Sequence, residues 1–138
     1  MLDIENENII LAKKAYIALN TVGSLKETIP EQPPIRVGEQ IAGQVNALLD
    51  EVREIFSSDK VFKESIAHMQ SLQYKYEPGG VSGGDGAVAM WGESDNGAQI
   101  ALQAKILLAE LEAKLKSFVS LYMPEKEKEK IGFHSSQK

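Results

Sequence analysis

The sequence predicts an all-α protein: a four-helix up-and-down bundle over residues 1–123, followed by a charged C-terminal tail at 124–138. Two segments, 37–56 and 95–122, place apolar residues at alternating steps of three and four, which is the seam of a packed helix. Two further segments are amphipathic and carry residues typical of helix ends. Four such helices joined by short links favour an antiparallel bundle.

The first helix is expected over 3–22, with Asp3 as its N-cap and Gly23 as its C-terminal stop. Its main apolar line consists of Ile9, Ala12, Tyr16 and Leu19. The sequence at 24–27 then matches a capping box and predicts one short turn. The link that follows contains three prolines, which predict a stiff extended chain: Pro30, Pro33 and Pro34.

The second and third helices are expected over 37–56 and 59–74. The apolar seam of the second helix comprises Ile41, Val45, Leu48, Val52 and Ile55. Two serines then interrupt the pattern, and Asp59 offers a new N-cap. The third helix is expected to carry one apolar face consisting of Phe62, Ile66, Met69 and Gln73.

The fourth helix is predicted to start at a Ser94 or Asp95 cap and to end near Tyr122, before Pro124. Its seam comprises Ala104, Leu108, Leu111, Leu115, Phe118 and Tyr122. This helix is much longer than the third, so part of its seam should lack a partner within the chain. The excess length predicts self-association. A short solvated helix is expected in the tail, ending at Gly132.

Composition and charge exclude several classes of function. The net charge is −5 with a pI near 5.1, which argues against nucleic acid or an anionic membrane as the main partner. The chain has no cysteine, which removes disulfides, thiolate metal sites and cysteine nucleophiles. No apolar run approaches the roughly 20 residues that span a bilayer, and the N-terminus is acidic where an export signal would be basic. A cytoplasmic protein is therefore expected.

A glycine-rich loop at 78–97 interrupts the helical pattern and contains seven of the eleven glycines and the only tryptophan. It has no lysine, and it lacks the spacing of a phosphate-binding loop or a dinucleotide fingerprint. Its oxygen-bearing side chains do not follow the alternation of an EF-hand: Asp85, Glu93, Asp95 and Asn96. We therefore expect no nucleotide, cofactor or calcium ion to bind there.

Catalytic and metal-ligating patterns are also missing elsewhere. Glu64 and His68 are spaced for an i, i+4 pair on the third helix, but there is no second such pair for a di-metal bundle, and the other histidine, His134, lies in the tail. No serine has the surroundings of an activated nucleophile. We therefore predict a non-enzymatic protein with no metal site and no cofactor.

The apolar run at 87–91 can form a short strand or hairpin arm, because glycines flank it on both sides. Trp91 either plugs the end of the bundle or anchors a protein partner, since Trp and Met are favoured at interfaces. The predicted partner-binding residues are Val88, Met90, Trp91, Leu115, Phe118 and Tyr122. The predicted function is a protein-interaction or assembly module (an adaptor, a helical chaperone or a subunit of a larger particle) that forms a homo-oligomer. The alternative is a small-ligand or metal-binding bundle that uses the loop as a lid.

Overall fold

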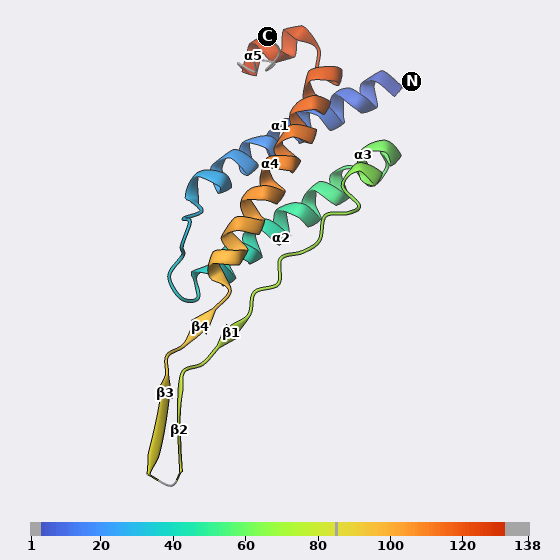
Figure 1. Cartoon of the computed structure of the whole chain (residues 1–138). Coiled ribbons are helices and arrows are strands. Elements are labelled where there is room, and N and C mark those ends of the chain that lie inside the picture. Colours follow the sequence, from blue (N-terminus) through green and yellow to red (C-terminus); the bar gives the residue numbers. More distant parts are fainter. Residues whose placement is uncertain (1–3, 85, 132–138) are drawn as a thin grey trace.

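The computed structural model describes residues 4–84 and 86–131. Within these residues three long helices form the body, a short helix packs beside them, another follows the last long helix, and four short strands form a ribbon at the opposite end from α3 and α5 (Figure 1). The helices are α1 (Ile4–Thr28), α2 (Val37–Ile55), α3 (Lys60–Ser65), α4 (Gly97–Tyr122) and α5 (Glu125–Ile131). The strands are β1 (Tyr76–Glu77), β2 (Gly80–Gly84), β3 (Ala87–Trp91) and β4 (Ser94–Asp95). Among the described residues, no helix is long and apolar enough to cross a membrane.

The predicted four-helix bundle is wrong, because the third helix stops after six residues. Residues 66–75, here called the strap, turn and then continue without helix along the body. The strap still buries Ile66, Met69 and Leu72, at a spacing of three. That spacing suits one face of a helix, but it also suits an extended chain with three residues per turn. The apolar pattern alone therefore did not distinguish the two.

Side chains from the helices bind the backbone of the strap. The Asn46 side chain accepts a hydrogen bond from the Leu72 N–H at 2.7 Å and donates one to the Leu72 carbonyl at 3.0 Å. Arg53 donates to the Met69 carbonyl, and Asn96 donates to the Gln73 carbonyl at 2.8 Å. These bonds satisfy backbone groups that a helix would satisfy internally, so the strap can remain extended beside the core.

The first helix is longer than predicted, because it continues through Gly23 to Thr28. A glycine inside a helix costs only about 1 kcal/mol, and the added turn makes tertiary contacts that offset it. Val22 is buried just before the glycine, and Lys26 donates to Glu112 of α4 at 2.9 Å. Three residues to which the sequence assigned a cap, a loop ligand or a stop lie outside the described residues: Asp3, Asp85 and Gly132.

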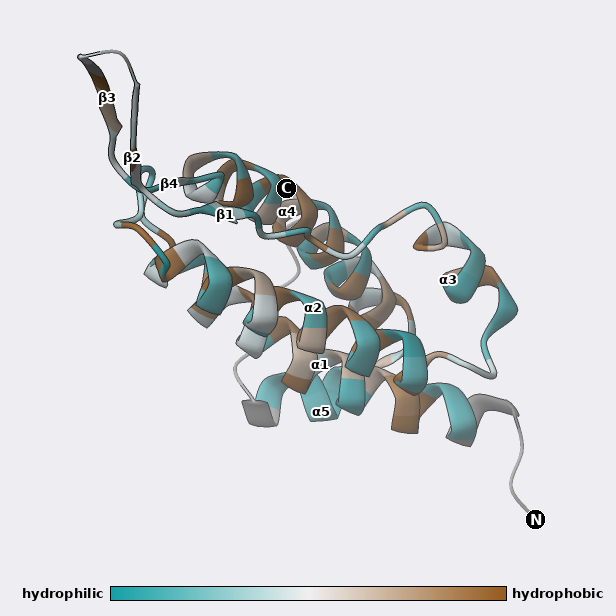
Figure 2. Ribbon diagram, turned by 90° about the horizontal axis from the view of Figure 1, so that it is seen from below, coloured by the Kyte–Doolittle hydropathy of each residue, from teal (hydrophilic) through white to brown (hydrophobic). Residues whose placement is uncertain are grey.

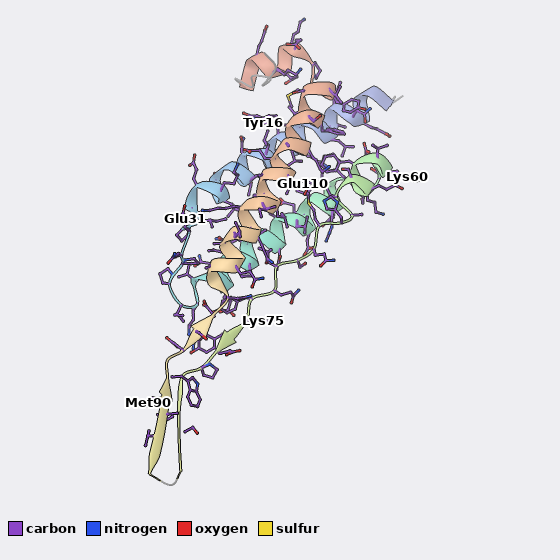
Figure 3. The ribbon with its side chains drawn as sticks, in the orientation of Figure 1. Tyr16, Glu31, Lys60, Lys75, Met90 and Glu110 are labelled. Atoms are coloured by element: carbon purple, nitrogen blue, oxygen red, sulfur yellow. The ribbon has the colours of Figure 1, made fainter. Side chains whose placement is uncertain are left out.

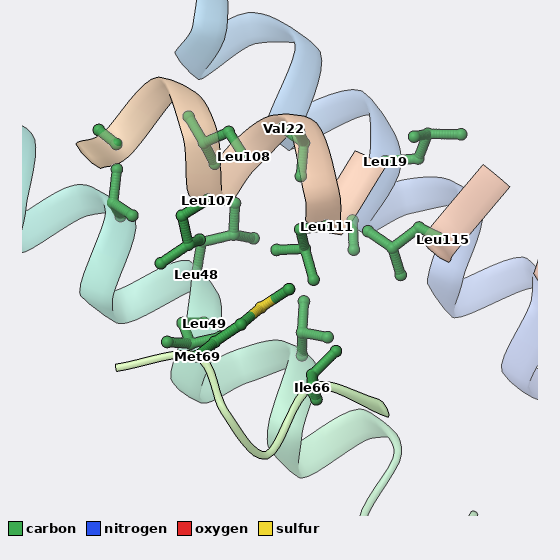
Figure 4. Close-up of a cluster of buried hydrophobic side chains, with 14 of the residues drawn as sticks. Leu19, Val22, Leu48, Leu49, Ile66, Met69, Leu107, Leu108, Leu111 and Leu115 are labelled. Carbon is green, nitrogen blue, oxygen red and sulfur yellow. The ribbon is translucent and has the colours of Figure 1, made fainter. Parts of the chain in front are cut away.

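The hydrophobic core lies between α1, α2, α4 and the strap (Figure 4). The helices present their apolar sides to this core and polar residues to much of the outer surface (Figure 2). The buried side chains in the close-up include Leu19, Val22, Leu48, Leu49, Ile66, Met69, Leu107, Leu108, Leu111 and Leu115. At the α3 end, three phenylalanines complete the core: Phe56, Phe62 and Phe118. The strap thus occupies the place expected for the missing fourth helix.

The remaining helices lie close to their predicted positions. α2 begins at Val37 as expected. Its heptad seam is buried from Ile41 to Val52, and Ile55 at the end of the seam is partly buried. α4 begins at Gly97, after β4 has used the residues that were expected to cap it. α5 falls in the predicted charged tail, where Lys128 donates to the Ser120 carbonyl at 2.9 Å.

Candidate protein-binding site

The glycine-rich loop is folded into an antiparallel ribbon. β1 pairs with β4, and β2 pairs with β3 from Gly80 opposite Trp91 to Gly84 opposite Ala87. This register leaves a two-residue connection, Asp85–Gly86, which is the sequence preferred in tight hairpin turns. Gly86 has φ +84, a backbone conformation that glycine adopts without strain. The β2–β3 pair, here called the hairpin, projects from the helical body (Figure 1).

One face of the hairpin is apolar and exposed. Val81 and Met90 are opposite each other in the register, and Val88 lies two residues from Met90 on the same side. Their exposed fractions are 66% for Val81, 77% for Met90 and 68% for Val88. These three side chains form an exposed apolar patch on this face of the hairpin.

The other face of the hairpin carries Trp91. Its indole lies across the glycine opposite to it: a Cβ atom placed on Gly80 would come within 2.8 Å of the ring. The indole is nevertheless 53% exposed, so Trp91 does not plug the end of the bundle. An isolated two-stranded ribbon is marginally stable in water. The hairpin therefore gains most from a partner that covers its apolar side chains.

The base of the hairpin is fixed by Asp95. Its carboxylate accepts from the Arg36 N–H at 2.8 Å, the Tyr74 hydroxyl at 2.7 Å and the Gly97 N–H at 2.9 Å. These donors, with the Arg36 N–H first, lower the pKa of Asp95, while partial burial and the bond to Asp95 raise the pKa of Tyr74 to about 12. Asp95 thereby joins β4 to the α1–α2 link, the end of the strap and the start of α4. These bonds fix the β4 end of the ribbon to the helical body.

A second layer of contacts extends this base toward the hairpin. The Arg36 guanidinium stacks over the Tyr76 ring, 4.1 Å from its centroid, and the Tyr76 hydroxyl binds Glu93. Gly79 lets the two strands approach closely, since a Cβ there would come within 2.8 Å of the Trp91 carbonyl oxygen. Glu93 and Asp95, considered above as calcium ligands, therefore have structural partners.

The predicted partner-binding residues fall at two ends of the molecule. Val88, Met90 and Trp91 lie on the hairpin, whereas Leu115, Phe118 and Tyr122 lie in the half of α4 far from it. Leu115 and Phe118 are buried in the chain's own core, and Tyr122 is partly exposed. Between α3 and this part of α4 is a groove of about 450 Å³, here called the end groove. Its apolar lining consists of Val61, Phe62, Phe118, Leu121 and Tyr122.

A second groove, of about 460 Å³, lies between the strap and α4. His68 borders it and binds Glu110 of α4 at 2.7 Å. The acidic partner of His68 is therefore Glu110 and not Glu64, which the sequence spacing suggested. The lining includes no residue of the hairpin. Apolar side chains such as Ile106 and Leu107 of α4 line it together with five amide side chains: Gln70, Gln73, Asn96, Gln99 and Gln103. In the part of the chain that the structure describes, no three acidic, His or Cys side chains gather as a metal site would need.

No family model matches this chain, and no curated protein or solved structure is significantly similar to it. The features of this chain that bear on function are a hairpin with an exposed apolar face at one end of the helical body and an apolar groove at the other end.

Titration of Tyr74 tests the base of the hairpin. Because its folded pKa of about 12 lies above the ordinary value of 10, the bond to Asp95 stabilises the fold fully below pH 10 and is lost as the pH rises toward 12. A difference titration of phenolate absorbance between the wild type and Tyr74→Phe should isolate a phenol that ionises near pH 12. If the phenol that the variant lacks ionises near pH 10 instead, the result would contradict the described contacts.

Proposed function

We propose that this protein is a non-enzymatic assembly module in which the hairpin of one copy binds the end groove of another copy. The observation that carries the proposal is the hairpin itself, which holds Val81, Val88 and Met90 in water on one face and Trp91 on the other. From Gly80 to Trp91 the only charged residue in the sequence is Asp85. Such a surface suits contact with protein and has no groups for catalysis.

A second copy fits the hairpin because the end groove is complementary to it in polarity and charge. Val61 and Leu121 expose large apolar side chains at the groove. Acidic Glu77 and Glu93 flank the hairpin, whereas the groove is lined by one lysine, Lys114 of α4. Asp59, also at the groove, is engaged as the N-cap of α3. Opposite charges at the rim favour encounter and register.

The hairpin does not reach its own end groove, because the two lie at opposite ends of the body. Met90 on the hairpin and Lys60 on α3 mark these ends in Figure 3. They are separated by the length of α4, whose 26 residues extend about 39 Å. A hairpin–groove contact therefore joins two molecules. We place this assembly in the cytoplasm, which the cysteine-free composition supports.

Trp91, the only tryptophan, allows a direct test. We expect its emission to move to shorter wavelength as the protein concentration rises through the range where light scattering shows the chains associating. Leu121→Lys, an exposed change in the end groove, should abolish the shift. Gln44→Lys, on the exposed side of α2, is the matched control and should preserve it.

Three results would contradict the proposal. The emission could stay that of a water-exposed indole while the chains associate. The Leu121→Lys protein could shift like the wild type. The chains could also remain single at every concentration tested, in which case the end groove has no occupant of this kind.

A further inference from the structure

The outer side of α4 carries an exposed apolar stripe. While the core side of the helix is buried, the opposite side presents Leu102, Ile106, Ala109 and Ala113 to water. Leu102 and Ile106 are each 61% exposed. α4 is therefore apolar on two opposite sides, and only the core side is covered within the described chain.

The stripe has the pattern of a helix–helix seam. Its steps are four, three and four residues, which is the heptad spacing of a coiled coil. No member of it is charged. Polar residues flank it, as they do at the edges of such seams: Lys105 and Glu112 on one side, Gln103 and Glu110 on the other.

We propose that this stripe pairs with the same stripe of a second copy, with the two α4 helices antiparallel about a two-fold axis. The large residues lie in the N-terminal half of the stripe and the small ones in the C-terminal half. An antiparallel pair sets Leu102 against the partner's Ala113 and Ile106 against the partner's Ala109, so every layer combines a large and a small side chain. A parallel pair would crowd the large residues at one end and leave only alanines at the other.

The flanking charges agree with the antiparallel direction. In this register Lys105 lies beside the partner's Glu112, and the two-fold axis repeats that pair. Glu112 also accepts from Lys26 within its own chain at 2.9 Å, so the carboxylate would bridge two lysines. On the other flank Gln103 faces the partner's Glu110. No like charges are brought together at these positions.

The same register relates α4 to the hairpin. The two-fold axis crosses the stripe between Ile106 and Ala109, so Gly97 at the start of α4 is level with the partner's Phe118. The hairpin end of each molecule then lies beside the end groove of the other. This consequence rests on the proposed function, whereas the pairing of the stripes does not.

Substitution of the stripe tests the pairing. Ile106→Lys places a charge in the seam at an exposed position, so far-ultraviolet circular dichroism should show the same helix content as the wild type. The wild type should be a dimer by light scattering, and the variant should dissociate at least tenfold more readily. Asn20→Lys, on the exposed side of α1, is the control and should dimerise like the wild type.

Disulfide trapping tests the direction, because the chain has no cysteine of its own. Leu102→Cys mixed with Ala113→Cys should give a mixed cross-linked dimer. Preferential cross-linking of Leu102→Cys to itself, or an Ile106→Lys protein that dimerises like the wild type, would overturn the inference. A dimer with a water-exposed Trp91 would instead contradict the hairpin contact and leave the helix pairing in place.

Discussion

Phe56→Ala is expected to lower the free energy of unfolding by about 3–5 kcal/mol, as large truncations in protein cores do. Phe56 is fully buried at the C-terminal cap of α2. Its ring stacks on Phe62 of α3 with centroids 3.8 Å apart and meets Phe118 of α4 edge-on at 5.0 Å. No neighbour can fill the space of this ring without disturbing the other two. Urea denaturation followed by circular dichroism measures the loss.

The matched control for this change is Val61→Ala, in the helix that Phe62 belongs to. Val61 is exposed, so the control should change the unfolding free energy by no more than about 0.5 kcal/mol. A loss of less than about 1 kcal/mol for Phe56→Ala would show that α3 is not held by the aromatic cluster. The end groove would then lack the rigid floor that the proposed function requires.

The long helices could be predicted because their apolar period is sustained. α2 and α4 each keep the heptad alternation over many residues, and the predicted seams are buried except at their last residues, Ile55 and Tyr122. Periodicity cannot indicate what covers the side opposite to the core. The sequence analysis assigned no role to Ile106 or Ala113, and their place on one exposed side can be recognised only when the core side of α4 is known.

The strap could not be predicted because its conformation depends on distant side chains. Asn46 and Arg53 bind its backbone, and neither residue lies within the segment that it holds. The error was to interpret the four-three-four spacing of Phe62, Ile66, Met69 and Gln73 as a helix, whereas Gln73 is exposed. At Gly23 the helix is longer than predicted: α1 continues to Thr28, because tertiary contacts stabilise the turn that follows this glycine.

The candidate site was predictable in part. The run Ala87–Trp91 was recognised as a possible hairpin arm, and the structure shows it as β3. The Asp85–Gly86 pair is the local signal that could have identified the turn and, with it, Val81 on the opposite strand. The end groove was harder to predict. Leu115 and Phe118 belong to the core, and the groove beside them is completed by Val61 of another helix.

Trp91→Ala is expected to weaken self-association by about 2 kcal/mol or more, which is roughly a 30-fold increase in the dissociation constant. The reason is that the indole is the largest side chain on the hairpin and is half exposed in the single chain. Its removal takes contact area from the complex with a second copy. The helical body should be little affected, because Trp91 contacts the hairpin at Gly80 and does not belong to the buried core.

The measurement has two parts, and both are needed. Sedimentation or light scattering over a dilution series gives the dissociation constant, and thermal unfolding at the lowest concentration gives the stability of the isolated chain. Trp91→Phe keeps an aromatic ring over Gly80 and should lose less affinity than Trp91→Ala. A drop of several kcal/mol in the stability of the isolated chain would mean that Trp91 supports the fold. An unchanged dissociation constant would mean that the hairpin is not the surface through which the copies meet, because no other tryptophan could replace its contact.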